Sequence, residues 1–219
     1  MEGCRLMALS VGEHMPDSSR ADILEAAAHC FMERGYAATS IDDVARRLGA
    51  TKGRIYHHYS SKSDLFADVF RFGMEMNYRA IEPFRLPGEK AVERWRQMAF
   101  AHVVQMITTR QFQRVVWEGV EMHLRGATTP EQRTVFAELI ERRSRYSDIF
   151  RDLLAEACED GDMAFENLGI TNQLVFITLN SPIFWYSPRA GETGRDIEDI
   201  ARQIVAFAMH GLGLRKGNP

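Results

Sequence analysis

The sequence is poor in cysteine, proline and long apolar runs, and each shortage excludes a class of protein. Its 219 residues include three cysteines, Cys4, Cys30 and Cys158, which lie far apart and form no C-x-x-C pair. We therefore expect neither a disulfide framework nor a structural zinc site, and a reducing cytoplasm fits this composition. The sequence contains no run of 18 apolar residues, the length needed to span a membrane, and no apolar signal segment precedes Ser18. Seven prolines and sixteen glycines are too few for a low-complexity chain.

Positive charge is scarce as well, because 27 Lys and Arg residues are outweighed by 30 Asp and Glu, for a net charge of −3. This balance excludes a protein that coats nucleic acid without regard to sequence, such as a nucleoid-compacting factor. Residues 18–62 differ, since they hold seven Lys and Arg against five Asp and Glu. A short basic segment of this kind is what a sequence-reading DNA module needs. With 45% apolar residues, the chain can also bury a core.

Helical periodicity and helix-end residues run along the whole chain, and no window alternates between apolar and polar residues as a strand does. The predicted fold class is therefore all-α, with about nine helices. Gly35 and Gly49 are placed to end the first two helices, and Pro182 is expected to kink the eighth. The predicted helices start at Asp17 or Ser18, Ser40, Thr51, Ser61, Gly88, Phe112, Pro130, Leu168 and Thr193.

Two short helices joined by Leu48-Gly49-Ala50-Thr51 form a helix-turn-helix pattern. Ser40 and Ser61 each precede an aspartate by three residues, which predicts capping boxes at the starts of two helices. The second short helix must offer a polar face to a major groove about 12 Å wide while its other face packs inward. In that register Ile55 and Tyr59 point inward, and the outward residues are Lys52, Gly53, Arg54 and His57.

This region resembles the tetracycline-repressor (TetR) family of bacterial regulators. The matching run consists of Gly35-Tyr36, Thr39-Ser40-Ile41, Val44-Ala45, Leu48-Gly49-Ala50-Thr51-Lys52-Gly53, Ile55-Tyr56-His57-His58-Tyr59 and Ser61-Lys62-Ser63-Asp64-Leu65. Arg54 and Ser63 depart from the residues common in the family. Residues 1–17 show no helical periodicity and are predicted to form a flexible arm. The resemblance implies a three-helix DNA-binding domain over 18–64 and a ligand-binding and dimerisation domain over 65–219.

The resemblance also implies a set of DNA contacts in the first domain. Two of these residues have a structural alternative, because Tyr59 could be a core aromatic and Thr39 could cap a helix. Lys52 and Arg54 have no evident structural role, and they are the strongest candidates. The predicted DNA-binding residues are Thr39, Ser40, Thr51, Lys52, Gly53, Arg54, Tyr56, His57, Tyr59 and Lys62.

Methionine and aromatic residues are concentrated between residues 66 and 125. Such residues at helical spacing build an ordinary core, but as a group they also suit a roomy apolar pocket. Because the resemblance implies an effector site here, we expect a small apolar effector. His102, alone on an apolar helix, is expected to be a hydrogen-bonded core residue. The predicted ligand-binding residues are Phe72, Met76, Met98, Met106, Phe112, Trp117 and Met122.

The last two predicted helices carry more apolar surface than one chain can cover. The helix over 168–186 is apolar almost all round, so it must be buried on more than one side. A four-helix bundle made of two helices from each chain of a homodimer satisfies this need. The predicted dimerisation residues are Phe176, Phe184, Ile197, Ile200, Ile204 and Ala208.

These patterns predict a ligand-responsive DNA-binding regulator in the cytoplasm, a repressor of a palindromic double-stranded operator, without membrane attachment, cofactor, metal site or catalytic activity. Phe184-Trp185-Tyr186-Ser187-Pro188 is similar to the corresponding part of family members that sense acyl-CoA or steroid-CoA thioesters. Drug- or aromatic-compound sensing is the alternative, and a helical enzyme based on His57-His58 is a remote one, since adjacent helical positions diverge by about 100°. A CoA effector would need bases at the pocket mouth, for which the candidates are Arg110, Arg114, Arg142, Arg143 and Arg145.

Overall fold

The computed structural model describes residues 18–86, 88–126 and 129–213, so the predicted arm over 1–17 lies outside the described residues. Helices are the only regular elements in these ranges, which confirms the all-α prediction. A 3-10 turn, η1 (Glu82–Phe84), also occurs. The α-helices are α1 (Ser18–Ala38), α2 (Ile41–Leu48), α3 (Lys52–Tyr56), α4 (Lys62–Ile81), α5 (Ala91–Thr108), α6 (Arg110–Arg125), α7 (Pro130–Glu159), α8 (Leu168–Asn180), α9 (Pro182–Trp185) and α10 (Gly194–Gly211).

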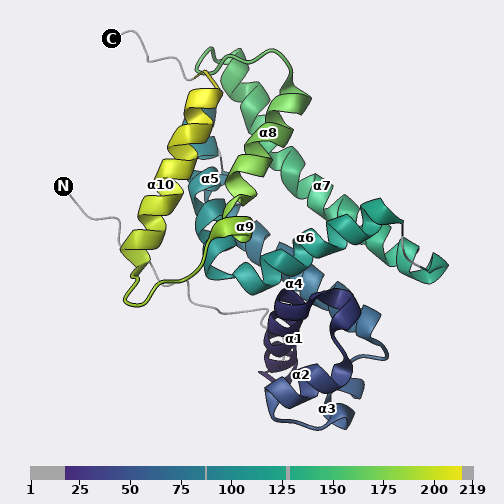
Figure 1. Cartoon of the computed structure of the whole chain (residues 1–219). Coiled ribbons are helices and arrows are strands. Elements are labelled where there is room, and N and C mark those ends of the chain that lie inside the picture. The colour runs from purple at the N-terminus through teal and green to yellow at the C-terminus, as the bar shows by residue number, and fades with distance from the viewer. Residues whose placement is uncertain (1–17, 87, 127–128, 214–219) are drawn as a thin grey trace.

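The first three helices form a small unit at one end of the molecule (Figure 1). The helical path of α1 is interrupted at Gly35, where φ is 76°, and Gly49 ends α2 in the left-handed region with φ of 66°. Ser40 and Asp43 close the predicted capping box at the start of α2. At α4 the box is half formed, because Asp64 N donates to Ser61 Oγ while the Asp64 side chain accepts from Ser60.

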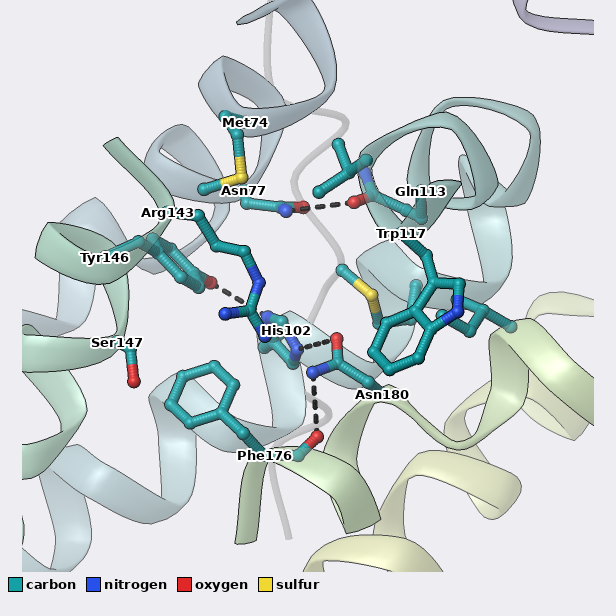
Figure 2. A pocket seen from close by; sticks show the side chains of 13 residues that line it. Met74, Asn77, His102, Gln113, Trp117, Arg143, Tyr146, Ser147, Phe176 and Asn180 are labelled. Atoms are coloured by element: carbon teal, nitrogen blue, oxygen red, sulfur yellow. Dashed lines mark hydrogen bonds between the residues drawn. The ribbon is translucent and has the colours of Figure 1, made fainter. Parts of the chain in front are cut away.

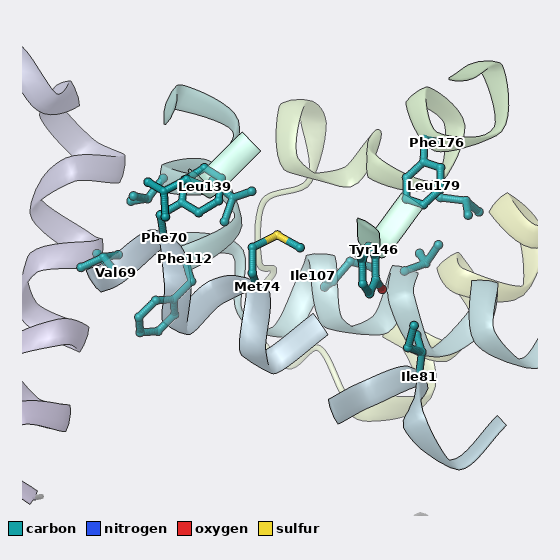
Figure 3. Close-up of a cluster of buried hydrophobic side chains, with 14 of the residues drawn as sticks. Val69, Phe70, Met74, Ile81, Ile107, Phe112, Leu139, Tyr146, Phe176 and Leu179 are labelled. Carbon is teal, nitrogen blue, oxygen red and sulfur yellow. The ribbon is translucent and has the colours of Figure 1, made fainter. Parts of the chain in front are cut away.

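The long helix α4 joins the small unit to the larger helical domain. It packs against α1 on one side and against α5, α6 and α7 on the other. A continuous core therefore runs from one domain into the next, and Figure 3 shows part of it around α4. Phe70 and Phe112 are fully buried in this core, and Gly119 of α6 lies against the Phe70 ring.

Helix α8 ends at Asn180, and Pro182 starts the short helix α9. This confirms the interruption expected from Pro182, which cannot donate a backbone hydrogen bond to the preceding turn. Counted across that kink, α8 and α9 are the single helix predicted over 168–186. The helix predicted from Gly88 begins later, at Ala91, with Lys90 as its N-cap.

Candidate DNA-binding surface and effector cavity

The short helix α3 presents a polar surface to solvent. Ile55 is fully buried, and Tyr56, with 53% of its surface exposed, lies on the outer side. The Tyr56 hydroxyl makes no hydrogen bond with any residue that the structure describes. Thr51, Lys52, Gly53 and His57 are exposed beside it, and Arg54 is half-buried. The outward face that the helix-turn-helix register requires is therefore present.

The basic residues on this surface are held in ion pairs that DNA can replace. Lys52 Nζ lies 2.6 Å from Asp42 Oδ2, and Arg54 Nη2 lies 3.3 Å from Asp22 Oδ2. Both pairs are largely exposed, and exposed pairs contribute only about 0–1 kcal/mol to stability. Lys52 and Arg54 can therefore exchange their carboxylate partners for phosphate or a base edge at little cost.

Four further predicted DNA contacts have partners within the protein, namely Thr39, Tyr59, Lys62 and Ser40. Thr39 is buried, and its hydroxyl donates to the carbonyls of Gly35 and Cys30. Tyr59 is 7% exposed and its hydroxyl donates to Asp68 at 2.6 Å, beside the bidentate pair of Arg20 and the same carboxylate. These bonds give Thr39 and Tyr59 the structural roles that the sequence left open for them.

Lys62 also points into the protein. Its ammonium donates to the carbonyls of Tyr36 at 2.7 Å and Thr39 at 2.8 Å, and it lies 4.4 Å from the centre of the Tyr36 ring. These carbonyls belong to the end of α1 and the turn after it, where backbone acceptors lack helical partners. Ser40, which also belongs to the predicted set, is occupied in the capping box, where its hydroxyl donates to Asp43.

The larger domain encloses a cavity between α4, α5, α6, α7, α8 and α9. The centre of a water molecule can reach about 30 Å³ of this cavity. Apolar side chains line one part of it, namely Met74, Met106, Val116, Trp117, Phe176 and Ile183. The remaining lining residues are polar, namely Asn77, His102, Gln113, Arg143, Tyr146, Ser147 and Asn180 (Figure 2).

A chain of hydrogen bonds fixes the polar floor of this cavity. Asn180 Nδ2 donates to the Phe176 carbonyl, so its Oδ1 accepts from His102 Nε2 at 3.3 Å. His102 Nδ1 then accepts from the Tyr146 hydroxyl at 2.9 Å. Burial is the main cause that lowers the pKa of His102 to about 4, and the nearby charge of Arg143 adds to it. His102 is therefore a neutral, hydrogen-bonded core residue, as predicted.

Two polar groups in the cavity lack protein partners. Arg143 extends from α7 toward His102 in Figure 2, and no described residue pairs with its guanidinium. Burial, without any compensating carboxylate, lowers the pKa of Arg143. On α4, Asn77 Nδ2 donates to Gln113, but Asn77 Oδ1 is buried with no hydrogen-bond partner. Asn77 Oδ1 is fully buried and Arg143 is half-buried. Because polar groups withdrawn from water are almost always paired, both indicate a space built for an occupant.

The structure brings only part of the predicted ligand set to this cavity. Met106 and Trp117 line it. Met98 and Phe112 are core residues packed away from it, and Phe72, Met76 and Met122 are partly buried against the same core. Of the polar lining residues, Arg143 was among the bases predicted at the pocket mouth, and His102 was predicted as a core residue. The other five were missed, because a single polar residue on an apolar helix face gives no sign of the helix that it will meet.

Helix α6 connects the cavity to the DNA-binding unit. Trp117 lines the cavity, and the next residue, Glu118, accepts a hydrogen bond from the Tyr36 backbone N–H at 2.6 Å. Burial raises the pKa of Glu118, and the Tyr36 hydrogen bond opposes that shift. Tyr36 follows the break at Gly35, and its carbonyl holds Lys62. Helix α6 therefore contacts both the cavity and the segment that leads into α2.

An apolar surface covers the outer faces of α8, α9 and α10. Of the predicted dimerisation residues, Phe184 is exposed, Ile197, Ile200 and Ile204 are half-buried, and Phe176 and Ala208 are buried within the chain. We call the exposed apolar residues of these helices the α8–α10 face; they are Ile170, Leu174, Ile177, Phe184, Trp185 and Phe207. Five of these six residues were not in the predicted set, because a helix that is apolar all round does not show which side the chain leaves open.

The described residues contain no group of three His, Cys, Asp or Glu side chains placed to hold a metal ion. Within the same ranges, no helix has the length and apolar character needed to cross a membrane.

Known proteins resemble this chain in sequence and in fold over nearly its whole length. The HTH-type transcriptional repressor KstR2 of Mycolicibacterium smegmatis is 23% identical over 203 residues, which cover 93% of this chain and 95% of the relative. Among solved structures, the ketosteroid regulator KstR2 of Mycobacterium tuberculosis has a TM-score of 0.76 at 21% identity, over 92% of this chain and 98% of that one. AibR, in complex with isovaleryl coenzyme A and operator DNA, has a TM-score of 0.70 at 20% identity, over 90% and 100%. These likenesses show a shared fold.

Family models settle the relationship. The model for bacterial regulatory proteins of the tetR family matches residues 23–69. The model for the tetracyclin repressor-like C-terminal domain matches residues 88–212, more than half of the chain. The helix-turn-helix at residues 41–56 and the helical domain beyond it thus carry the features of both models, and the chain belongs to the TetR family of DNA-binding transcriptional regulators.

Proposed function

We propose that this protein is a homodimeric repressor that leaves its operator when a small organic effector fills the cavity. The observation that carries the proposal is the position of α6, whose Trp117 lines the cavity and whose Glu118 holds the backbone of Tyr36. A ligand that binds better to one position of α6 than to the other shifts the population between two arrangements of the DNA-binding units. The names of KstR2 and AibR agree with repression and with a small-molecule effector.

In the DNA-bound state, two α3 helices would read half-sites about 34–36 Å apart on one face of the duplex. The side chains offered for this purpose are Lys52, Arg54 and Tyr56 of α3, together with His57 at its C-cap. The experiment starts with selection of a bound sequence from a random duplex library, followed by fluorescence anisotropy. A palindromic selected site is the expected result. Binding that ignores sequence would overturn the proposal.

The dimer would form by pairing of the α8–α10 faces of two chains. Phe207, at 71% exposure, is the most exposed residue of this face, so Phe207→Asp should give a monomer in sedimentation and abolish tight operator binding. Ile204→Asp, at the half-buried edge of the face, should act in the same direction. Leu124→Asp is the matched control, because Leu124 is just as exposed but lies on α6. A wild-type monomer at micromolar concentration would contradict the dimer.

The effector class has two candidates, a CoA thioester and a drug-like aromatic compound. AibR, bound to isovaleryl coenzyme A, supports the first. Of the five candidate arginines, however, Arg143 alone lines the cavity, and Arg142 and Arg145 are paired with Glu75 and Glu141. Titration of the operator complex with an acyl-CoA, its free acid and an uncharged aromatic compound separates these classes by which one releases DNA.

A further inference from the structure

We infer that Arg143 is the anion-binding residue of the cavity, and that the effector places a carboxylate against it with a hydrocarbon body toward Trp117. This inference rests on the proposed effector function of the cavity and names the chemistry that the cavity recognises. A carboxylate at this place could belong to a free organic acid or to the far end of a dicarboxylic acyl chain.

The first argument is the charge balance of the cavity. Its lining holds one cation, Arg143, and no aspartate or glutamate. The neighbouring His102 is held neutral, so the protein supplies no counter-charge. Arg143 is half-buried, and a charge that is partly withdrawn from water without a partner is unfavourable. A ligand with one negative charge completes the balance, whereas the several phosphates of coenzyme A have no partners inside.

The second argument is geometry. Ser147 lies one helical turn after Arg143 on α7, so both side chains face the cavity from the same side. Ser147 Oγ already accepts from Asn172 Nδ2 at 2.9 Å, which leaves its own proton free to donate. A guanidinium fork and a hydroxyl donor together match the planar oxygens of a carboxylate. Trp117 lies across the cavity in Figure 2, where it can pack on the rest of the molecule.

The third argument is adaptability. The centre of a water molecule can reach only about 30 Å³ of the cavity, so an effector must displace lining side chains to enter. Met74 and Met106 can re-pack around a short chain, since an unbranched thioether adapts to several shapes. A short organic acid such as hexanoate therefore enters by moving these side chains aside, and it displaces fewer of them than a bulkier effector would.

The test measures direct binding by calorimetry with hexanoate and with hexanamide, its uncharged isostere. Wild-type protein should bind hexanoate at least tenfold more tightly, and Arg143→Met should remove this preference while Arg143→Lys keeps part of it. Arg145→Met is the control, because Arg145 lies on the same helix but is exposed and paired with Glu141. Hexanoate binding that is absent in wild type, or unchanged in Arg143→Met, would overturn the inference.

Two further measurements separate a ligand role from a structural one. Without ligand, Arg143→Met should melt at a higher temperature than wild type, because it removes an unpaired charge; a lower Tm would mark Arg143 as structural and contradict the inference. The binding of suberyl-CoA, whose acyl chain ends in a carboxylate, is compared with that of octanoyl-CoA. If suberyl-CoA binds more tightly than both octanoyl-CoA and hexanoate, the carboxylate at Arg143 belongs to a dicarboxylic acyl chain. If operator binding is intact but neither carboxylate probe binds, this inference is wrong while the repressor proposal stands.

Discussion

The two tyrosines at the end of the helix-turn-helix offer a sharp test, because the resemblance assigns both to DNA while the structure separates them. Tyr59 is buried and its hydroxyl donates to the Asp68 carboxylate at 2.6 Å. Tyr59→Phe keeps the buried ring and removes this one hydrogen bond. A hydrogen bond to a charged acceptor contributes about 1.5–3 kcal/mol. For a protein of this size, each kcal/mol shifts Tm by about 2–4 °C, so the expected fall is about 3–12 °C.

The matched control is Tyr56→Phe, whose hydroxyl faces solvent without a partner among the described residues. It should leave Tm unchanged and weaken operator binding. Tyr59→Phe should do the opposite, with a lower Tm and near-normal operator affinity measured well below that Tm. The assay pairs thermal unfolding by circular dichroism with anisotropy on the selected site. A Tyr59→Phe protein with wild-type Tm and weakened operator binding would refute the structural role of Tyr59.

Three further predictions follow from other contacts. Lys62→Met should lower Tm, because the Lys62 ammonium donates hydrogen bonds to the carbonyls of Tyr36 and Thr39, but it should not change how steeply operator affinity falls with salt concentration. If the variant instead releases about one counterion fewer in a salt titration, the Lys62 ammonium contacts a DNA phosphate. Gly119→Ala should lower the free energy of unfolding in urea by about 1–2 kcal/mol although alanine has the better helix propensity, because a Cβ there would lie 2.7 Å from Phe70 Cδ2. The control is Gly211→Ala, whose Cβ would meet nothing within 4 Å and should leave this free energy unchanged. The lowered pKa of His102 makes the unfolded chain bind more protons below pH 6.5, so stability should fall by up to about 3 kcal/mol between pH 6.5 and pH 4; an identical fall in His102→Gln would exclude His102 as the cause.

Local features of the molecule could be predicted from sequence because their causes are local. Ser40 and Asp43 are three residues apart, and this spacing alone closes the capping box of α2. Gly49 adopts the left-handed conformation that ends a helix, which other residues rarely adopt. The polar outer side of α3 follows from helical periodicity in the same way. These signals need no knowledge of what the helices contact later.

The partners of long side chains were decided by the tertiary structure. Lys62 reads as a phosphate contact in a basic segment, yet the turn after α1 brings three carbonyls within its reach. Tyr59 finds Asp68 nine residues later, and both meet Arg20 of α1. In each case the competing partner lies on another element, so spacing along the chain could not reveal it.

The cavity shows the same division most clearly. The sequence by itself determined an all-helical chain, a DNA-reading helix and an excess of apolar surface near the end. Among Arg142, Arg143 and Arg145, it could not select the arginine that turns inward, because successive helical positions differ by about 100° and the packing of α7 on α4, α5, α6 and α8 sets the inner side. The half-buried position of Arg143 beside His102, without a carboxylate partner among the described residues, is therefore a property of the assembled helices alone.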